Sequence, residues 1–287
     1  VNGFSVGTII WNSTLSFKTD ADITWTWPGS KSVKGIQNNG AWPGYGFGGE
    51  GGDVRLTAGG NGAITLQNTI ATGGLVALSA VRGLTATAGA GIVAESLKLT
   101  GQGAVTLNGQ TRVGSLAANI INSGGFVYTN TGDLKIENVD GTKGIQVSGP
   151  GATNISVRST SGDLTVNQEV KSEADFSATI KTSTATVTLR ARDDLKLAAN
   201  VTAQGGATSS GDSASISLSA DVGGVFQTSG VISAVDMGGT TPAAQGPQLG
   251  AATLPRFDPH LGGVRSRHGA IFLAEVQVCF HSIALLD

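Results

Sequence analysis

The dominant pattern of the chain is a short alternation of apolar and polar residues that recurs about every thirty residues. Four segments share one form, in which a Gly-Asp or Asp-Asp pair precedes an apolar–polar–apolar triplet: 52–56, 132–136, 162–166 and 193–197. In the last three, the aspartates that precede the triplet are Asp133, Asp163 and Asp194, which follow one another at an almost constant interval. Such alternation is typical of half-buried β-strands, so the segments predict strands that recur with a fixed period.

Weaker copies of the same alternation lie between these segments and suggest three parallel tracks. One track begins its triplets at Ile64, Leu97, Phe126, Ile155, Val187 and Ile216, and another at Leu84, Leu116, Ile145 and Phe176. The track formed by the four Gly-Asp and Asp-Asp segments extends backward to Val105 and Val76. Three tracks with one period predict three short strands per repeat, separated by turns rich in Gly, Asn, Asp and Ser.

A repeat of this kind buries its apolar positions only if successive repeats wind into stacked coils. The predicted fold is therefore all-β, a right-handed parallel β-helix of three-strand coils of about thirty residues, with a triangular cross-section. An antiparallel sandwich is the competing architecture, because short strands at regular spacing also suggest one. The common period favours the coil, since a sandwich does not require it.

The ends of the chain differ from this pattern. Residues 1–50 hold all four tryptophans and are predicted as a cap or irregular first coils, followed by the β-helix over 51–236. Residues 237–259 have the Pro, Gly, Ala and Gln composition of a linker. Residues 260–287 are predicted as a C-terminal cap or tail, in which 276–280 has the pattern of one more strand.

Composition excludes several protein classes. Gly contributes 44 of 287 residues, hydrophobic residues are 39% and charged residues 13%, which fits neither a charged helical protein nor a disordered one. Seven prolines are too few for collagen. The net charge of −2 provides no basic field for nucleic acid, and the single cysteine excludes an internal disulfide framework.

The same composition suggests where the protein works. Abundant Thr, Ser, Asn and Gly with little Lys is typical of secreted bacterial surface proteins, so we expect a secreted or cell-surface location, with any leader peptide already removed. The most apolar stretch, 269–286, is interrupted by Glu275, Gln277 and His281 and does not read as a membrane span.

Three segments resemble filamentous-haemagglutinin-type bacterial adhesins and related surface β-helix repeat proteins. They are Gly-Asp-Leu-Thr-Val-Asn at 162–167, Asp-Asp-Leu-Lys-Leu-Ala-Ala-Asn-Val-Thr-Ala at 193–203 and Gly-Val-Ile-Ser-Ala at 230–234. The resemblance covers roughly residues 52–234 and implies secretion, an extended shaft, and adhesion or surface assembly. These are fold motifs, so the resemblance implies no catalytic residue. The tail after Met237 departs from the family's pattern and suggests a truncated or altered C-terminus.

Two motifs are weak candidates for catalysis. Ser5 lies in a Gly-x-Ser-x-Gly sequence like the nucleophile elbow of esterases, but no helix pattern follows it, so a turn is the favoured interpretation. Asp193 and Asp194 resemble the adjacent carboxylates of β-helix polysaccharide hydrolases. Neighbouring strand residues point to opposite faces, so we interpret Asp194 as a turn residue that accepts backbone N–H bonds, like Asp133 and Asp163.

Binding sites are also weakly indicated. Trp25 and Trp27 alternate with threonines and would share one strand face, where two indoles could stack on sugar rings, although a core or cap cluster is the commoner arrangement. The aspartates carry no calcium-roll repeat and the three histidines lack zinc-site spacing, so no metal and no cofactor are expected.

The sequence therefore predicts a non-enzymatic extracellular β-helix that acts as a structural or adhesive module. Host or cell-surface glycans or proteins are the expected partners, together with self-association through the ends of the β-helix. A carbohydrate-active enzyme, a lyase or a hydrolase, is the alternative on the same fold, and an ester hydrolase is less favoured.

Overall fold

The computed structural model describes residues 15–19, 23–25, 53–67, 69–122, 124–175, 183–205, 213–236 and 275–280. These residues form an all-β structure of mostly parallel strands, and none of them is helical. Two large sheets contain nearly all the strands, and a small two-stranded hairpin lies beside them.

Sheet 1 has fourteen strands: β1 (Leu15–Thr19), β3 (Val54–Ala58), β5 (Ile70–Ala71), β6 (Leu75–Ala80), β8 (Ile92–Gln102), β10 (Arg112–Ile121), β12 (Leu134–Ile136), β15 (Ile145–Pro150), β17 (Leu164–Val166), β18 (Val170–Asp175), β20 (Leu195–Leu197), β21 (Val201–Gly205), β23 (Val225–Gln227) and β24 (Ile232–Asp236). Sheet 2 has nine: β2 (Ile23–Trp25), β4 (Ile64–Leu66), β7 (Leu84–Ala86), β9 (Val105–Leu107), β11 (Phe126–Asn130), β16 (Ala152–Ser159), β19 (Thr184–Ala191), β22 (Ser213–Ala220) and β25 (Glu275–Phe280). The hairpin consists of β13 (Asn138–Val139) and β14 (Thr142–Lys143).

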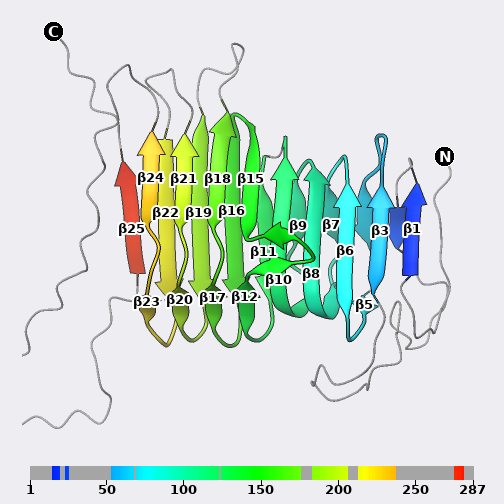
Figure 1. The fold of residues 1–287 in the computed structure, drawn as a ribbon, viewed down its shortest axis with the longest axis horizontal. Helices are drawn as coiled ribbons and strands as arrows, with labels where there is room; N and C mark the ends of the chain where they lie inside the picture. The colour runs from blue at the N-terminus through cyan, green and yellow to red at the C-terminus, as the bar shows by residue number, and fades with distance from the viewer. Residues whose placement is uncertain are drawn as a thin grey trace, which may run out of the picture.

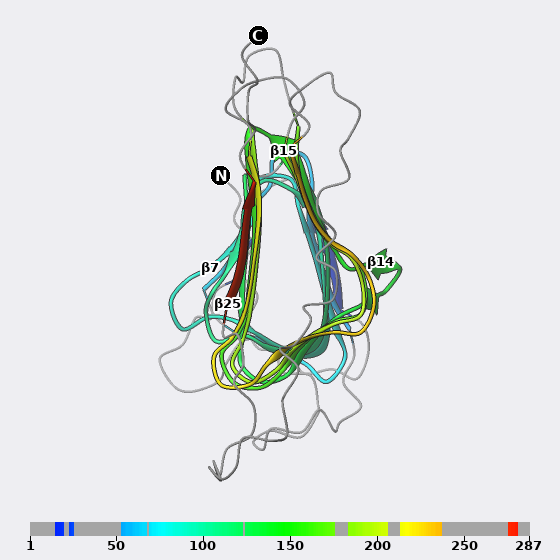
Figure 2. The same ribbon diagram turned by 90° about the vertical axis from the view of Figure 1, so that its left-hand side faces the viewer.

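The chain passes back and forth between the two sheets, and each passage adds strands next to those of the previous one (Figure 1). Viewed from the end, the strands of successive passages lie over one another around a common interior (Figure 2). We call one such passage through both sheets a circuit. Parallel pairing dominates because each circuit enters a sheet in the same direction as the circuit before it.

The interior is lined by the apolar positions of the alternating pattern. Leu134 pairs with Leu164, and Leu164 pairs with Leu195, both in parallel register, and all three side chains are almost fully buried. This confirms the predicted stacking of these leucines and is incompatible with an antiparallel sandwich. Each such row is continuous along the molecule, so every circuit is stabilised by burial against its neighbours.

The predicted period of about thirty holds only for the second half of the stack. From β12 onward, each register partner in sheet 1 follows the previous one by about thirty positions: Ile136, Val166, Leu197 and Gln227. Before β12 the corresponding steps are only about twenty positions: Val54, Val76, Leu97, Leu116 and Ile136. The prediction of a uniform coil of about thirty residues is therefore wrong for the first half.

The change in period reflects how many strands make one circuit. In the first half, the long strands β8 and β10 each cover without interruption the part of sheet 1 that two separate strands cover in the second half. At β10 the sheet divides, since Leu116 pairs with Ile136 of β12 whereas Ala118 pairs with Ile145 of β15. From there each circuit contributes two separate strands to sheet 1, and the additional turn between them lengthens the circuit.

This division also corrects the predicted tracks. The triplets at Leu84 and Val105 lie in sheet 2, in line with Ile64 and Phe126, whereas Leu97 lies in sheet 1. The three predicted tracks form two sheets instead of one sheet each, because β8 and β10 join two tracks into one sheet. The interval from Leu97 to Phe126 has the length of one long circuit, but in this half of the stack it spans about one and a half short ones.

Strands from both predicted end segments join the sheets. β1 pairs in parallel with β3, and β2 pairs in parallel with β4. At the other end β25 pairs with β22, as the predicted extra strand requires, but in antiparallel register. The linker predicted over 237–259 lies outside the described residues.

Candidate functional site

The aspartates that mark the repeat form a ladder along one corner of the molecule. Oδ1 of Asp133 accepts the backbone N–H of Asp163 at 2.9 Å, and Oδ1 of Asp163 accepts that of Asp194 at 2.9 Å. Oδ1 of Asp194 accepts the N–H of Gly224 at 3.1 Å. Each carboxylate thus satisfies a donor of the following circuit, in agreement with the turn role predicted for Asp194.

A lysine reinforces this ladder. Lys196 donates from Nζ to Oδ2 of Asp163 at 2.5 Å and lies 3.6 Å from Oδ2 of Asp194. Its hydrogen bond lowers the pKa of Asp163, and the same contact raises the pKa of Lys196. Both groups are partly exposed, so we assign the pair a small contribution to stability.

The adjacent carboxylates proposed for sugar chemistry therefore have different surroundings. Asp194 is engaged by Gly224 and Lys196, whereas Asp193 is exposed and its backbone N–H donates to the carbonyl of Gly162 at 3.1 Å. A glycosidase needs one acid and one base facing a single sugar bond. The contacts of Asp194 stabilise the turn in which both residues lie, so its carboxylate has a structural role.

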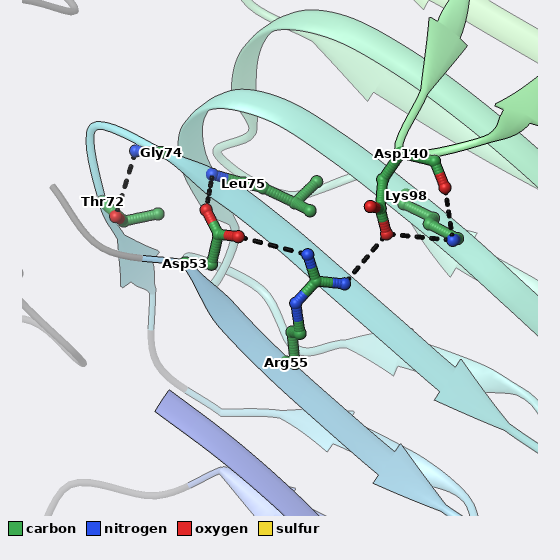
Figure 3. A network of polar contacts seen from close by, with 7 residues as sticks. All are labelled: Asp53, Arg55, Thr72, Gly74, Leu75, Lys98 and Asp140. Carbon is green, nitrogen blue, oxygen red and sulfur yellow. Dashed lines mark hydrogen bonds and ion pairs between the residues drawn. The ribbon is translucent and has the colours of Figure 1, made fainter. Parts of the chain in front are cut away.

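Among the described residues, a charged network lies under the β13–β14 hairpin, an element that the alternating pattern does not predict (Figure 3). Asp140, at the tip of the hairpin, accepts hydrogen bonds from Arg55 of β3 at 2.8 Å and from Lys98 of β8 at 3.0 Å. Arg55 also binds Asp53 at 3.1 Å, and Asp53 accepts the N–H of Leu75 at 3.1 Å. The network therefore connects residues up to 85 positions apart in the sequence.

The hairpin has a recognisable sequence signal. Asp140 and Gly141 have φ values of 48° and 82°, and Asp-Gly is the pair that favours a tight hairpin turn with two positive φ angles. Behind the tip, Val139 packs with Leu75 and Ala117 in a small apolar cluster on the outside of sheet 1. The hairpin is thus fixed by charge at its tip and by apolar contact at its base.

The ion pairs of this network change the pKa of its central carboxylate. Hydrogen bonds from Arg55, and then from Lys98, lower the pKa of Asp140 to about 2. The same contact with Asp140 raises the pKa of Arg55. Each charged side chain of this network has an oppositely charged partner. The network therefore holds strands together and offers no unpaired group for catalysis.

The outward side of sheet 2 is different in character. A row of register partners across seven strands carries hydroxyl groups at every position but one: Thr65, Thr85, Thr106, Val127, Ser156, Thr188 and Ser217. Two strands broaden this row, since β19 and β22 read Thr-x-Thr-x-Thr and Ser-x-Ser-x-Ser-x-Ser on the outward side. The only charged residues of β16, β19 and β22 are Arg158 and Arg190, which pair in register.

The remaining predicted site residues are only partly covered by the structure. Ser5 and Trp27 lie outside the described residues. Trp25 ends β2 and is the register partner of Leu66, which is fully buried, so its backbone position lies in a row of core residues. The sugar-stacking role of the two tryptophans stays a prediction.

The described part of the chain also bears on metal ions and membranes. Among the described residues, no three His, Cys, Asp or Glu side chains gather closely enough to hold a metal ion. Within those residues there is also no helix with the length and hydropathy needed to cross a bilayer.

Comparisons of the chain with protein-family models, curated proteins and solved structures found no match. The functional argument consequently depends on the geometry of this molecule.

Proposed function

We propose that this chain is a right-handed parallel β-helix that serves as a structural and adhesive module of a secreted or surface protein. The proposal draws on the parallel register of successive circuits, on the right-handed sense that parallel crossovers nearly always take, and on the resemblance to haemagglutinin-type repeats. Glycans or proteins on a host or cell surface are its proposed partners. Association of chains through the ends of the stack is proposed as a second mode.

One observation carries this proposal: the carboxylates of the repeat connect one circuit to the next. Asp133, Asp163 and Asp194 each accept a backbone N–H from the following circuit. An enzyme built on the same corner would instead direct its carboxylates toward an open substrate site. Acidic residues used in this way lengthen a shaft and hold its strands in register.

The experiment is a turnover assay with the full chain. Polysaccharides and simple esters are incubated with the wild type, with Ser5→Ala and with the double variant Asp193→Asn/Asp194→Asn, and reducing ends, unsaturated ends and released acid are measured. We expect no turnover by any of the three proteins. Reproducible turnover by the wild type that one variant loses would establish the alternative, an enzyme acting on polysaccharides or esters.

A further inference from the structure

We propose that the β13–β14 hairpin is a salt-sensitive strap that opens separately from the stack and uncovers an apolar strip on the outside of sheet 1. The strap consists of residues 138–143, and it projects from the outer side of the stacked strands (Figure 2). The strip consists of Leu75, Ala77 and Ala117, against which Val139 of the strap packs. This inference is independent of the proposed adhesive function.

The strap is an insertion in a turn that later circuits make without it. In those circuits three residues, 167–169 or 198–200, connect the two strands of sheet 1. At the strap the same connection spans 137–144. Gly144 donates its N–H to the carbonyl of Glu137 at 3.1 Å, so the turn has its own hydrogen bond at the base of the strap. The strap can therefore leave sheet 1 without breaking a strand of the stack.

The backbone of the strap forms no hydrogen bond with the backbone of either large sheet within the described residues. Asn138 pairs with Lys143 and Val139 pairs with Thr142, and these antiparallel pairs form a sheet of their own. In contrast, β12, which precedes the strap, is paired on both sides, with β10 and with β17. Strands of the stack are thus held in two ladders, whereas side-chain contacts hold the strap against sheet 1.

These contacts follow one row of register partners on the outside of sheet 1. The row extends from β3 to β10 and consists of Arg55, Ala77, Lys98 and Ala117. Arg55 donates to Oδ2 of Asp140 at 2.8 Å (Figure 3). Lys98 donates to the backbone carbonyl of Asp140 at 2.8 Å and to its Oδ2 at 3.0 Å. Charged and small residues alternate along the row, so the strap tip binds the charges and the short alanines let the strap lie close to the sheet.

The strap is held less firmly than a strand of the stack. At its tip, the side chains of Arg55 and Asp140 are 35% and 37% exposed, and ion pairs that water reaches are weak and screened by salt. At its base, Val139 is the only buried residue of the strap. A three-residue strand such as β17 buries two side chains, Leu164 and Val166. Opening of the strap therefore requires less free energy than opening of such a strand.

Opening changes what the outside of sheet 1 presents to water. Leu75 is 8% exposed and Ala117 is fully buried, although both lie on the outward side of their strands, next to the core residues Val76 and Leu116. They are kept from water in a cluster with Val139. Opening exposes this cluster, and salt favours opening because it screens the ion pairs of the tip. The strap thus couples the apolar character of this face to ionic strength.

The first test is native-state hydrogen exchange of the full chain, followed amide by amide at increasing urea concentrations. The paired amides of β13 and β14 report opening of the strap, because a two-stranded hairpin detached from a sheet is marginally stable. The N–H of Leu164, which donates to the carbonyl of Asp194 at 2.9 Å, reports opening of the stack. We expect urea to accelerate exchange strongly at Leu164 and little in the strap. Equal protection and equal urea dependence at both places would overturn the proposal.

Three variants test what holds the strap. In the wild type, strap amides should exchange several-fold faster in about 1 M salt than at low salt. Asp140→Asn should exchange about fivefold faster at low salt and lose this salt dependence, because the ion pairs are gone. Val139→Ala should also exchange about fivefold faster but keep the salt dependence. The control is Lys143→Gln, since Lys143 is exposed and forms no ion pair with any described residue; it should behave like the wild type. A salt dependence that survives in Asp140→Asn would overturn the salt-sensitive strap.

A thiol beneath the strap tests whether opening uncovers the strip. Cys279 is the only cysteine of the chain, so Leu75→Cys in a Cys279→Ser background carries a single thiol at the strip. Its labelling by a maleimide should accelerate several-fold at high salt, in parallel with exchange in the strap. Thr202→Cys in the same background, on the outward side of β21, is the control for direct effects of salt on the reagent. Labelling at Leu75→Cys that is independent of salt, or that changes only as much as at Thr202→Cys, would overturn the proposal.

Discussion

At the scale of single residues, Asn130 shows how an interior polar group supports the corner of a circuit. Its side chain is fully buried, and Oδ1 accepts the N–H of Val113 at 2.9 Å and the hydroxyl of Tyr128 at 3.2 Å. Nδ2 donates to the carbonyls of Val113, Gly132 and Asp133 at 3.1 to 3.2 Å. One amide thus satisfies backbone groups of two neighbouring circuits at a turn where the ladder hydrogen bonds stop.

Replacing Asn130 should therefore cost much more than replacing its neighbour. Asn130→Ala leaves several buried backbone groups unpaired and should lower the free energy of unfolding by about 3 kcal/mol. Tyr128→Phe removes one hydroxyl group, which donates a hydrogen bond to Asn130. It should lower the free energy of unfolding by about 1 kcal/mol. Chemical denaturation of both variants measures the difference. Equal costs would mean that water replaces the asparagine.

Burial of Tyr128 has its own consequence. Its hydroxyl is enclosed, and this loss of water contact raises the pKa of the phenol well above its ordinary value. The phenol should therefore stay protonated in the folded protein at pH values where an exposed tyrosine ionises.

At the scale of elements, the β13–β14 hairpin joins strands of the first half of the stack from outside. It leaves sheet 1 after β12, where short circuits give way to long ones, and its tip contacts β3 and β8. Gly144 follows the hairpin with a φ of 64°, and a Cβ there would collide with the carbonyl oxygen of Glu169. The return of the chain into β15 therefore requires glycine at this position.

The hairpin should contribute stability that depends on pH. The ion pairs hold the pKa of Asp140 at about 2 in the folded protein, below the ordinary value of 3.8. Their contribution is therefore complete above about pH 4 and is lost as the pH falls toward 2. Asp140→Asn should cost about 1 kcal/mol at pH 7, a value kept small because the side chain is 37% exposed.

Unfolding of the wild type and Asp140→Asn between pH 2 and 7 measures this contribution. The difference between the two proteins should shrink as the pH falls below 4, and it should be smaller at high salt at every pH. A difference that stays constant over this range would show that Asp140 acts through hydrogen bonding alone.

At the scale of the whole molecule, the stack has ends that must be covered. β25 pairs antiparallel with β22 through six residue pairs and so occupies the last edge of sheet 2. In this register Val278 is the partner of Ile216 and Val276 is the partner of Leu218, and both partners on β22 are core residues. An uncovered strand edge invites strands from other chains, so we expect this pairing to protect the edge of β22.

Deletion of residues 261–287 should therefore increase aggregation. The edge of β22 would be exposed, while the sheets before it keep their own pairing, so the β content of the remaining chain should change little. Light scattering and circular dichroism test both parts. A soluble monomer with unaltered thermal stability would show that β25 does not protect the edge.

The sequence by itself determined most of the strands of the two sheets, their inward residues and the role of the repeat aspartates. These features are local, because alternation with a period of two decides which side chains are buried, and a short carboxylate at a turn reaches the nearest free N–H. Leu134, Leu164 and Leu195 could be aligned because the circuits between them have almost equal lengths.

Only the tertiary structure decided which strands stack and what lies on the outside. Every triplet has the same apolar–polar–apolar form, so spacing alone cannot distinguish one long circuit from one and a half short ones. The predicted rows of Leu97 and Val105 are wrong for this reason. The contacts of Asp140 with Arg55 and of Arg158 with Asp221 join residues that are far apart in the chain. Such pairs depend on the register of strands that are distant in sequence, and no local pattern encodes that register.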